Sequence, residues 1–259
     1  MILQYKGISV FYTDKGKGKT IVLLHGFLEN STMWKAFIPE FTKQHRVICI
    51  DLLGHGKTGC LGYVHTMELM AEVVNAVLNH LKILKYTVIG HSMGGYVALA
   101  LAEKHNKPID ALCLMNSTPS ADNPERQKNR DRAITAVKQN YKTFVRIAIV
   151  NLFRPKNRRI FSKEIKLVKQ EALKTSVQGI IAALEGMKIR KDRWEIIKNA
   201  PFRRFMIISK KDPVLNYSEL LNGAKKLNID FVEFPDGHMS HIENKELFLQ
   251  NIMHFIDFN

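Results

Sequence analysis

Two kinds of apolar pattern alternate along this chain, and their alternation limits the folds it can adopt. Residues 20–25 and 46–51 have continuously apolar interiors, which is typical of parallel strands covered on both faces. Residues 67–81 carry apolar side chains at helical spacing instead. Because parallel strands need a crossover connection, usually a helix, the alternation predicts an α/β fold with a mostly parallel central sheet flanked by helices.

The same patterns place the remaining elements of the sheet layer. An N-terminal hairpin is expected at residues 2–5 and 8–12, where two short β-prone runs flank Lys6 and Gly7. Further strands are expected at 86–90, 110–116, 202–209 and 229–234, and further helices at 31–44, 93–105, 217–227 and 240–255.

Residues 117–200 interrupt this alternation, because the strand signal disappears and helical periodicity punctuated by prolines replaces it. We therefore expect a core domain made of residues 1–116 and 201–259, with residues 117–200 inserted as a helical cap.

The basic charge of the chain belongs mainly to this middle segment. The formal net charge is +15, and residues 117–200 hold 20 of the 39 Lys and Arg but only 8 of the 24 Asp and Glu. Few aromatic residues are interleaved, so we interpret the segment as a solvated helical surface and expect no nucleic-acid partner. If basic residues between 126 and 159 line a pocket, they would instead bind a substrate carboxylate or phosphate. An accessory role at a membrane or nucleic-acid surface stays open.

The three cysteines, Cys49, Cys60 and Cys113, are odd in number and have no metal-binding or CxxC spacing. A disulfide framework and a metal site are therefore not expected. No signal-peptide pattern opens the sequence, and no apolar run approaches the roughly 18 residues of a membrane span. These observations favour a reducing, cytoplasmic location.

One motif carries chemistry: Gly90-His91-Ser92-Met93-Gly94 is a G-x-S-x-G sequence where a buried strand ends and a helix begins. A serine in so sharp a turn is forced into strained dihedral angles that raise its hydroxyl above the sheet edge. Glycines two residues to either side let the strand and the helix approach. The context favours Ser92 as a nucleophile.

A serine hydroxyl needs a base, and the base needs an acid that holds its tautomer. Asp212 follows the strand expected at 202–209, and His238 follows the strand expected at 229–234. Both side chains should thus lie with Ser92 at the carboxyl edge of the sheet. We predict His238 as the base and Asp212 as the acid.

Other polar residues compete for these roles. His241 lies three residues after His238 and is expected to be a surface or pocket-rim group. Asn116 and Ser117 follow the strand expected at 110–116, and neither has a carboxylate, which favours Asp212 as the acid.

Over nearly the whole chain these motifs resemble the α/β-hydrolase superfamily, in its cap-bearing branch of esterases, lipases and related serine hydrolases. The resemblance includes His25-Gly26-Phe27 after an early strand, Asp51 to Gly56 after the next strand, and Gly237 to Glu243 near the end. It implies that the backbone N–H groups of Phe27 and Met93 form an oxyanion hole. It also implies that Asp51 and His55 belong to a structural loop. The residues it implies around the substrate are His25, Gly26, His91 and Trp34.

The expected function is hydrolysis of small or medium carboxylic esters through an acyl-enzyme, without a cofactor, by a monomer or homodimer. Ser92 rather than aspartate at the elbow disfavours halide displacement and epoxide opening, which require a carboxylate nucleophile. The same triad could serve carbon–carbon bond hydrolysis, thioester hydrolysis or a lyase step on an anionic substrate, because fold and motif do not separate these reactions. A ligand-binding receptor on the same fold is a further alternative.

Overall fold

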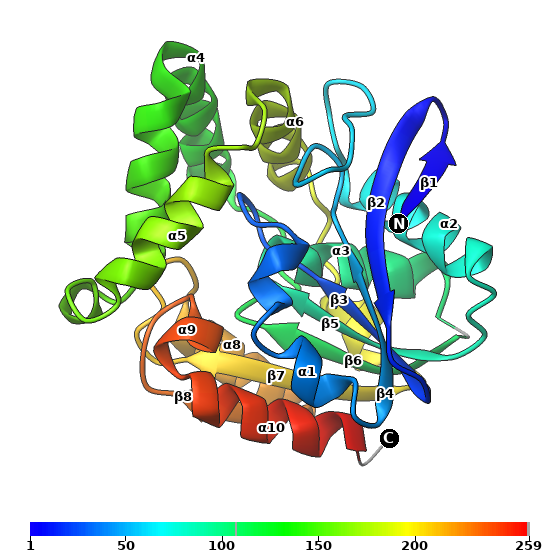
Figure 1. Cartoon of the computed structure of the whole chain (residues 1–259). Helices are drawn as coiled ribbons and strands as arrows, with labels where there is room; N and C mark the ends of the chain where they lie inside the picture. Colours follow the sequence, from blue (N-terminus) through cyan, green and yellow to red (C-terminus); the bar gives the residue numbers. More distant parts are fainter. Residues whose placement is uncertain (107, 258–259) are drawn as a thin grey trace.

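The computed structural model describes residues 1–106 and 108–257, and its described strands form one eight-stranded sheet of order β1-β2-β4-β3-β5-β6-β7-β8 (Figure 1). The hairpin strands β1 and β2 are antiparallel, β2 also pairs antiparallel with β4, and all later neighbours are parallel. The strands are β1 (Ile2–Tyr5), β2 (Ile8–Lys15), β3 (Lys19–Leu24), β4 (His45–Ile50), β5 (Tyr86–His91), β6 (Ile109–Met115), β7 (Arg203–Ser209) and β8 (Asp230–Phe234). The predicted mostly parallel α/β sheet is confirmed.

Helices cover both faces of the sheet, which explains the continuously apolar strands. In β3, Val22 and Leu24 join a core with helices α2 (Met67–His80), α3 (Met93–Lys104) and α8 (Tyr217–Lys226). Ile21 and Leu23 of the same strand join the opposite core, beneath α1 (Ile38–Phe41) and α10 (Lys245–Asp257). Every second side chain therefore meets a different helix layer.

Two predicted helices are wrong in their extent. The helix expected at 31–44 is a 3-10 turn, η1 (Ser31–Trp34), followed by the short α1. The ring of Pro39, near the start of α1, is incompatible with a helix running through from residue 31. The helix expected at 240–255 is divided at Asn244, whose φ of −138° and ψ of 48° are not helical, into α9 (Ser240–Glu243) and α10.

Between β6 and β7 the regular elements of the described chain are all helices, as predicted. In Figure 1 these helices, α4, α5 and α6, stand above the carboxyl ends of the parallel strands. The long helix α4 bends at Asn140, where φ is −156° and ψ is 85°. The division into core and cap domains remains a prediction. The elements are α4 (Pro124–Leu152), η2 (Pro155–Asn157), α5 (Ser162–Ala172), α6 (Val177–Lys188) and α7 (Trp194–Lys198).

Two glycines hold α6 directly against the sheet-side loops. A Cβ on Gly179 would lie 2.1 Å from the carbonyl oxygen of Gly54, and a Cβ on Gly186 would lie 1.8 Å from that of His65. The backbone N–H of His65 also donates to the carbonyl of Ala182 at 2.9 Å. These contacts leave no room for a side chain, so α6 is fixed in place by backbone packing.

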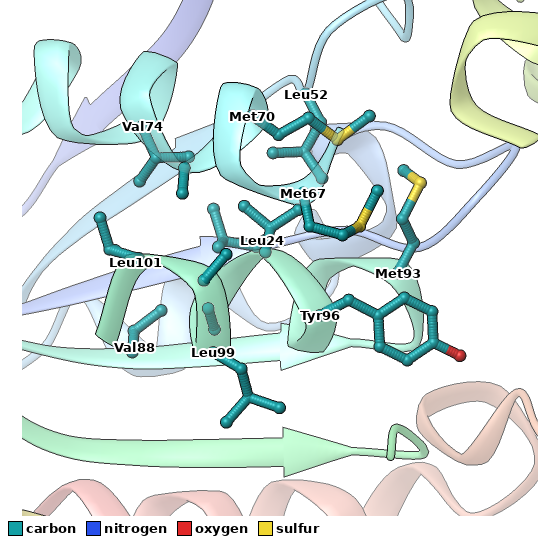
Figure 2. Packing of buried hydrophobic residues seen from close by; sticks show 14 of the residues in the cluster. Leu24, Leu52, Met67, Met70, Val74, Val88, Met93, Tyr96, Leu99 and Leu101 are labelled. Carbon is teal, nitrogen blue, oxygen red and sulfur yellow. The ribbon is translucent and has the colours of Figure 1, made fainter. Parts of the chain in front are cut away.

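The core between the sheet and α2 and α3 reaches the functional edge of the sheet. Figure 2 shows it continuing from Val74 and Leu101 to Met93 and Tyr96 at the start of α3. The Met93 side chain is fully buried there. Packing of that side chain therefore fixes the position of the Met93 backbone. Within the residues described, no helix is long and apolar enough to cross a lipid bilayer.

Candidate active site

Ser92 occupies a strained turn between β5 and α3. Its φ of 50° and ψ of −114° lie in a region that a serine seldom adopts. A Cβ on Gly90 would lie 2.4 Å from the carbonyl oxygen of Gly94, and a Cβ on Gly94 would lie 2.4 Å from that of Leu24. The two glycines of the motif are therefore required by close backbone contacts, and the strain raises the Ser92 side chain above the sheet.

Ser92, His238 and Asp212 form one connected hydrogen-bonded row. The Ser92 Oγ lies 2.8 Å from Nε2 of His238, and Nδ1 of His238 lies 2.7 Å from Oδ2 of Asp212. The side chains of His238 and Asp212 are almost completely buried. In the tautomer that fits, Ser92 donates to Nε2 and Nδ1–H donates to the carboxylate. This arrangement can remove a proton from Ser92 and stabilise the imidazolium that results.

Asp212 is held as an anion by donors on both of its oxygens. Oδ1 accepts the backbone N–H groups of Val214 at 2.8 Å and Leu215 at 3.1 Å. Oδ2 also accepts the amide of Asn116 at 3.0 Å. Burial acts to raise the pKa of Asp212, but the neighbouring His238 and these hydrogen bonds outweigh it and leave the pKa lowered.

Asn116 is a site residue whose role the sequence reading did not find. Its amide donates to Asp212 and to Ser209 Oγ, and its Oδ1 accepts from Ser240 Oγ at 2.6 Å. The backbone of Asn116 has a φ of 44°, and asparagine tolerates such a conformation better than most residues. The signal in the sequence is its position directly after β6, at the same edge of the sheet as Ser92.

Glu29 was also missed, although it lies at the centre of the site. Its Oε2 accepts the backbone N–H of Gly26 at 2.8 Å and lies 2.7 Å from Nδ1 of His91. Nε2 of His91 lies 3.1 Å from the carbonyl oxygen of His238. Since both ring nitrogens of His91 face acceptors, the ring is an imidazolium.

The ionisation of this pair follows from its surroundings. Burial acts to raise the pKa of Glu29, but His91 opposes it and lowers that pKa to about 2. Burial acts to lower the pKa of His91, and the charge and hydrogen bond of Glu29 reverse the effect, so the pKa is raised. Glu29 and His91 thus form an ion pair beside the triad.

The N–H groups predicted for an oxyanion hole are free to bind. Met93 is the first residue of α3, so its N–H has no acceptor within the helix. The N–H of Phe27 has no hydrogen-bond acceptor among the described residues. Phe27 lines the same cavity as Ser92, and the positive end of α3 favours negative charge beside Met93.

A cavity of about 720 Å³ opens onto the row. Ser92 and His238 lie in its wall, together with Gly26, Phe27 and His91. Apolar residues of the helical segment form much of the rest, and charged and amide residues gather on the first half of α4. These further lining residues include Ala133, Phe144, Ala148, Leu152, Leu184 and Met187 among the apolar ones, and Asn123, Glu125, Arg126, Asn129 and Arg130 among the polar ones.

Two predicted substrate-binding residues, His25 and Trp34, lie outside the lining of this cavity. His25 is buried, with Nδ1 donating to the carbonyl of Gly26 at 2.8 Å and Nε2 accepting the N–H of Leu52 at 2.9 Å. Trp34 is a core residue whose ring packs near His241 and Phe248. Trp34 ends the 3-10 turn η1 with its ring in the core, and His25 is held by backbone groups, so neither side chain reaches the cavity.

His241 and the loop at Asp51 have supporting positions as well. His241 is buried rather than at the surface or rim, and burial lowers its pKa to about 3, which makes it unsuitable as a base. Asp51 accepts the N–H groups of Ser31 at 2.7 Å and Lys57 at 2.9 Å, as expected of a structural loop. The three cysteines are free thiols.

Comparison with known proteins decides the family. The model of the alpha/beta hydrolase fold family matches residues 19–245. The chain belongs to the α/β-hydrolase fold family.

Three similar proteins illustrate the range of this family. A malate-bound thermophilic esterase from Thermogutta terrifontis is 30% identical, with a TM-score of 0.91, and the match covers 99% of this chain and 96% of that one. The 2-hydroxy-6-oxo-6-(2'-aminophenyl)hexa-2,4-dienoic acid hydrolase of Metapseudomonas resinovorans is 30% identical over 43% of this chain and 40% of its own length. The pimeloyl-[acyl-carrier protein] methyl ester esterase of Aeromonas hydrophila is 33% identical over 43% of each protein. The chain thus spans less than half the length of these two curated relatives.

Proposed function

We propose that this protein is a serine hydrolase that cleaves carboxylic esters through an acyl-enzyme. The observation that carries the proposal is the continuous row from Ser92 Oγ through His238 to Asp212, with contacts of 2.8 Å and 2.7 Å. This row opens onto a cavity large enough for a small organic substrate. Ester-cleaving relatives in the family support the choice of bond.

The first half of the reaction forms the acyl-enzyme. Ser92 Oγ attacks the ester carbonyl while His238 Nε2 takes its proton, and Asp212 stabilises the imidazolium. The carbonyl electrons move onto oxygen, where the N–H groups of Phe27 and Met93 stabilise the negative charge. When the carbonyl forms again, the alcohol leaves with the proton that His238 returns to it.

The second half repeats these steps with water. His238 removes a proton from water as its oxygen attacks the acyl carbonyl, and the same two N–H groups stabilise the second oxyanion. Collapse releases the carboxylic acid and returns the proton to Ser92. Residues 117–200 act as a cap in this proposal, because Phe144, Leu152 and Met187 from α4 and α6 form apolar wall beside the reacting groups.

Carbon–carbon bond hydrolysis is the runner-up, because the same nucleophile, base and oxyanion hole would serve it. The Metapseudomonas resinovorans relative, named as a hydrolase of a dienoic acid, is the observation that favours this alternative. If this protein cleaved carbon–carbon bonds, it would release an acid from a vinylogous diketone and would be inactive on simple esters.

Labelling with a small fluorophosphonate tests the proposal most directly. Intact mass should show one adduct on the wild type and on Ser218→Ala, which removes an exposed hydroxyl from α8. Ser92→Ala and His238→Ala should show none, and both should lose hydrolysis of 4-nitrophenyl acetate and butyrate. An adduct on Ser92→Ala equal to that of the wild type would overturn the assignment.

A further inference from the structure

A buried carboxylate just before α4 contacts three arginines, two of which line the cavity. The side chain of Asp122 is fully buried, and its Oδ1 forms an ion pair with Nη1 of Arg190 at 2.6 Å. Its Oδ2 accepts from Nε of Arg130 at 3.0 Å, and Nε of Arg126 lies 3.5 Å from Oδ1. One negative charge therefore faces three guanidinium groups.

Arg190 already compensates the charge of Asp122. Its side chain is as buried as that of Asp122, and its guanidinium stacks on the Tyr96 ring with 4.2 Å between their centres. A buried carboxylate must keep a close partner, and Arg190 provides it. The charges of Arg126 and Arg130 are thus left largely without a counter-charge of their own.

Two carboxylates at the rim do not remove this excess. Glu125 and Glu219 both line the cavity, but among the described residues neither lies within 4.0 Å of a nitrogen of Arg126 or Arg130. Glu219 accepts a hydrogen bond from Ser120 Oγ instead. The third lining carboxylate, Glu29, is neutralised by His91.

Arg130 is the better placed of the two cavity arginines. Asp122 holds its Nε, while no described residue accepts a hydrogen bond from its two terminal nitrogens. The Arg130 side chain is 19% exposed and lies in the wall of the cavity that contains Ser92. Arg126, by contrast, donates a hydrogen bond from one terminal nitrogen to the carbonyl oxygen of Val214 at 3.0 Å. A guanidinium anchored at Nε presents its terminal pair in the geometry that binds a carboxylate with two hydrogen bonds.

We propose that Arg130, supported by the charge of Arg126, binds a carboxylate of the substrate at the α4 end of the cavity. The substrate class is then a half-ester of a dicarboxylic acid, or an ester whose alcohol carries a carboxylate, with apolar atoms between the two groups. The apolar wall made by Ala133, Phe144 and Ala148 fits that middle portion. This inference rests on the proposed function, because it places the second end of the same substrate.

Paired substrates of equal length test the proposal. Monomethyl adipate is compared with methyl hexanoate, so that the carboxylate lies in the acyl part. In the second pair, 4-carboxyphenyl hexanoate is compared with 4-methylphenyl hexanoate, so that the carboxylate lies in the alcohol part. The wild type should prefer the anionic member of at least one pair by about tenfold or more in kcat/KM, mainly through KM. The preference should shrink as salt rises.

Variants at position 130 identify the group responsible. Arg130→Gln should lower the anionic-to-neutral ratio of kcat/KM by about 10-fold to 100-fold. Arg130→Lys keeps the positive charge beside Asp122 and should recover only part of the preference, since an ammonium lacks the two-nitrogen fork. The control is Arg132→Gln, an exposed residue of the same helix, whose ratio should match that of the wild type.

The failures of the two proposals are distinguishable. Equal rates on charged and neutral esters, or a preference that survives Arg130→Gln, would overturn the anion site while leaving the hydrolase intact. Loss of every ester activity together with no fluorophosphonate adduct would overturn the hydrolase. In that case, calorimetric binding of adipate to the wild type and to Arg130→Gln still decides the anion site, because equal binding by the two proteins would refute it.

Discussion

The Glu29 carboxylate and the His91 imidazolium form a buried ion pair, with 2.7 Å between Oε2 and Nδ1. Through it, the turn that carries Phe27 is joined to the residue before Ser92, because Glu29 also accepts the N–H of Gly26. His91 then donates to the carbonyl of His238. One charged pair therefore connects the segments expected to supply the oxyanion hole, the nucleophile and the base.

Replacing Glu29 with glutamine should weaken the fold and the reaction together. The change leaves His91 without its counter-charge, and breaking a buried pair costs about 3 kcal/mol in free energy of unfolding. The turn at Gly26 and Phe27 should loosen as well, which lowers kcat by about tenfold or more. Urea unfolding and steady-state kinetics measure both effects. Glu40→Gln, which breaks a pair with Lys43 at the surface, is the control and should change little. Equal behaviour of the two variants would show that the buried pair contributes nothing.

Asp212→Asn should lower kcat by about 10³-fold to 10⁴-fold with little change in KM. The donors around position 212 give the reason. The N–H groups of Val214 and Leu215 would attract the amide oxygen of the new side chain, which turns its NH2 group toward Nδ1 of His238. The proton of the ring would then move to Nε2, which could no longer accept from Ser92. A variant with nearly wild-type kcat would remove Asp212 from the mechanism.

Gly186→Ala should destabilise the protein, although alanine is the better helix former by about 1 kcal/mol. The new methyl group would lie 1.8 Å from the carbonyl oxygen of His65, so α6 or the loop must move. Overpacking of this kind costs about 1 to 3 kcal/mol. Denaturant unfolding beside Val177→Ala, an exposed position of the same helix, gives the comparison. A more stable Gly186→Ala variant would contradict the close backbone contact.

Acid should unfold the protein through its buried histidines. Burial lowers the pKa of His55 and His241 to about 3 and that of His65 to about 4, against an ordinary value of 6.5, and it also lowers the pKa of His25. The unfolded chain therefore binds more protons as the pH falls below 6.5, and stability is lost toward low pH at about 1.4 kcal/mol per pH unit for each group. The raised pKa of His91 does not oppose this change, because His91 is protonated in both states over most of that range.

Urea unfolding at pH 7, 6 and 5 measures this slope directly. His241→Asn should flatten it by about a quarter, since one of the four buried histidines with a lowered pKa is removed. A free energy of unfolding that stays constant from pH 7 to pH 5 would show that these histidines are not held neutral by burial.

The local residue pattern was sufficient to predict the sheet and the three groups proposed for catalysis. The apolar runs of β3, β4 and β5 are decided by burial on both faces, and a turn as tight as that around Ser92 requires its glycines whatever lies nearby. The ends of neighbouring parallel strands meet at one edge, so the positions of Asp212 and His238 after β7 and β8 already implied their proximity to Ser92.

Side chains that act through partners distant in the chain could be recognised only in the tertiary structure. Glu29 and His91 are 62 residues apart, and Asn116 and Asp212 are 96 residues apart, so no local pattern reports their contacts. The role of Arg130 is also hidden in the sequence, because the residue pattern of a basic helix is the same whether its charged side chains face solvent or a cavity. The α/β sheet and the groups at its edge follow from the order of the residues, since they depend on burial and local backbone geometry. The ion pair of Glu29 and His91, the support of Asp212 and the direction of Arg130 follow only from the folded chain, since each depends on which surfaces come together when the chain folds.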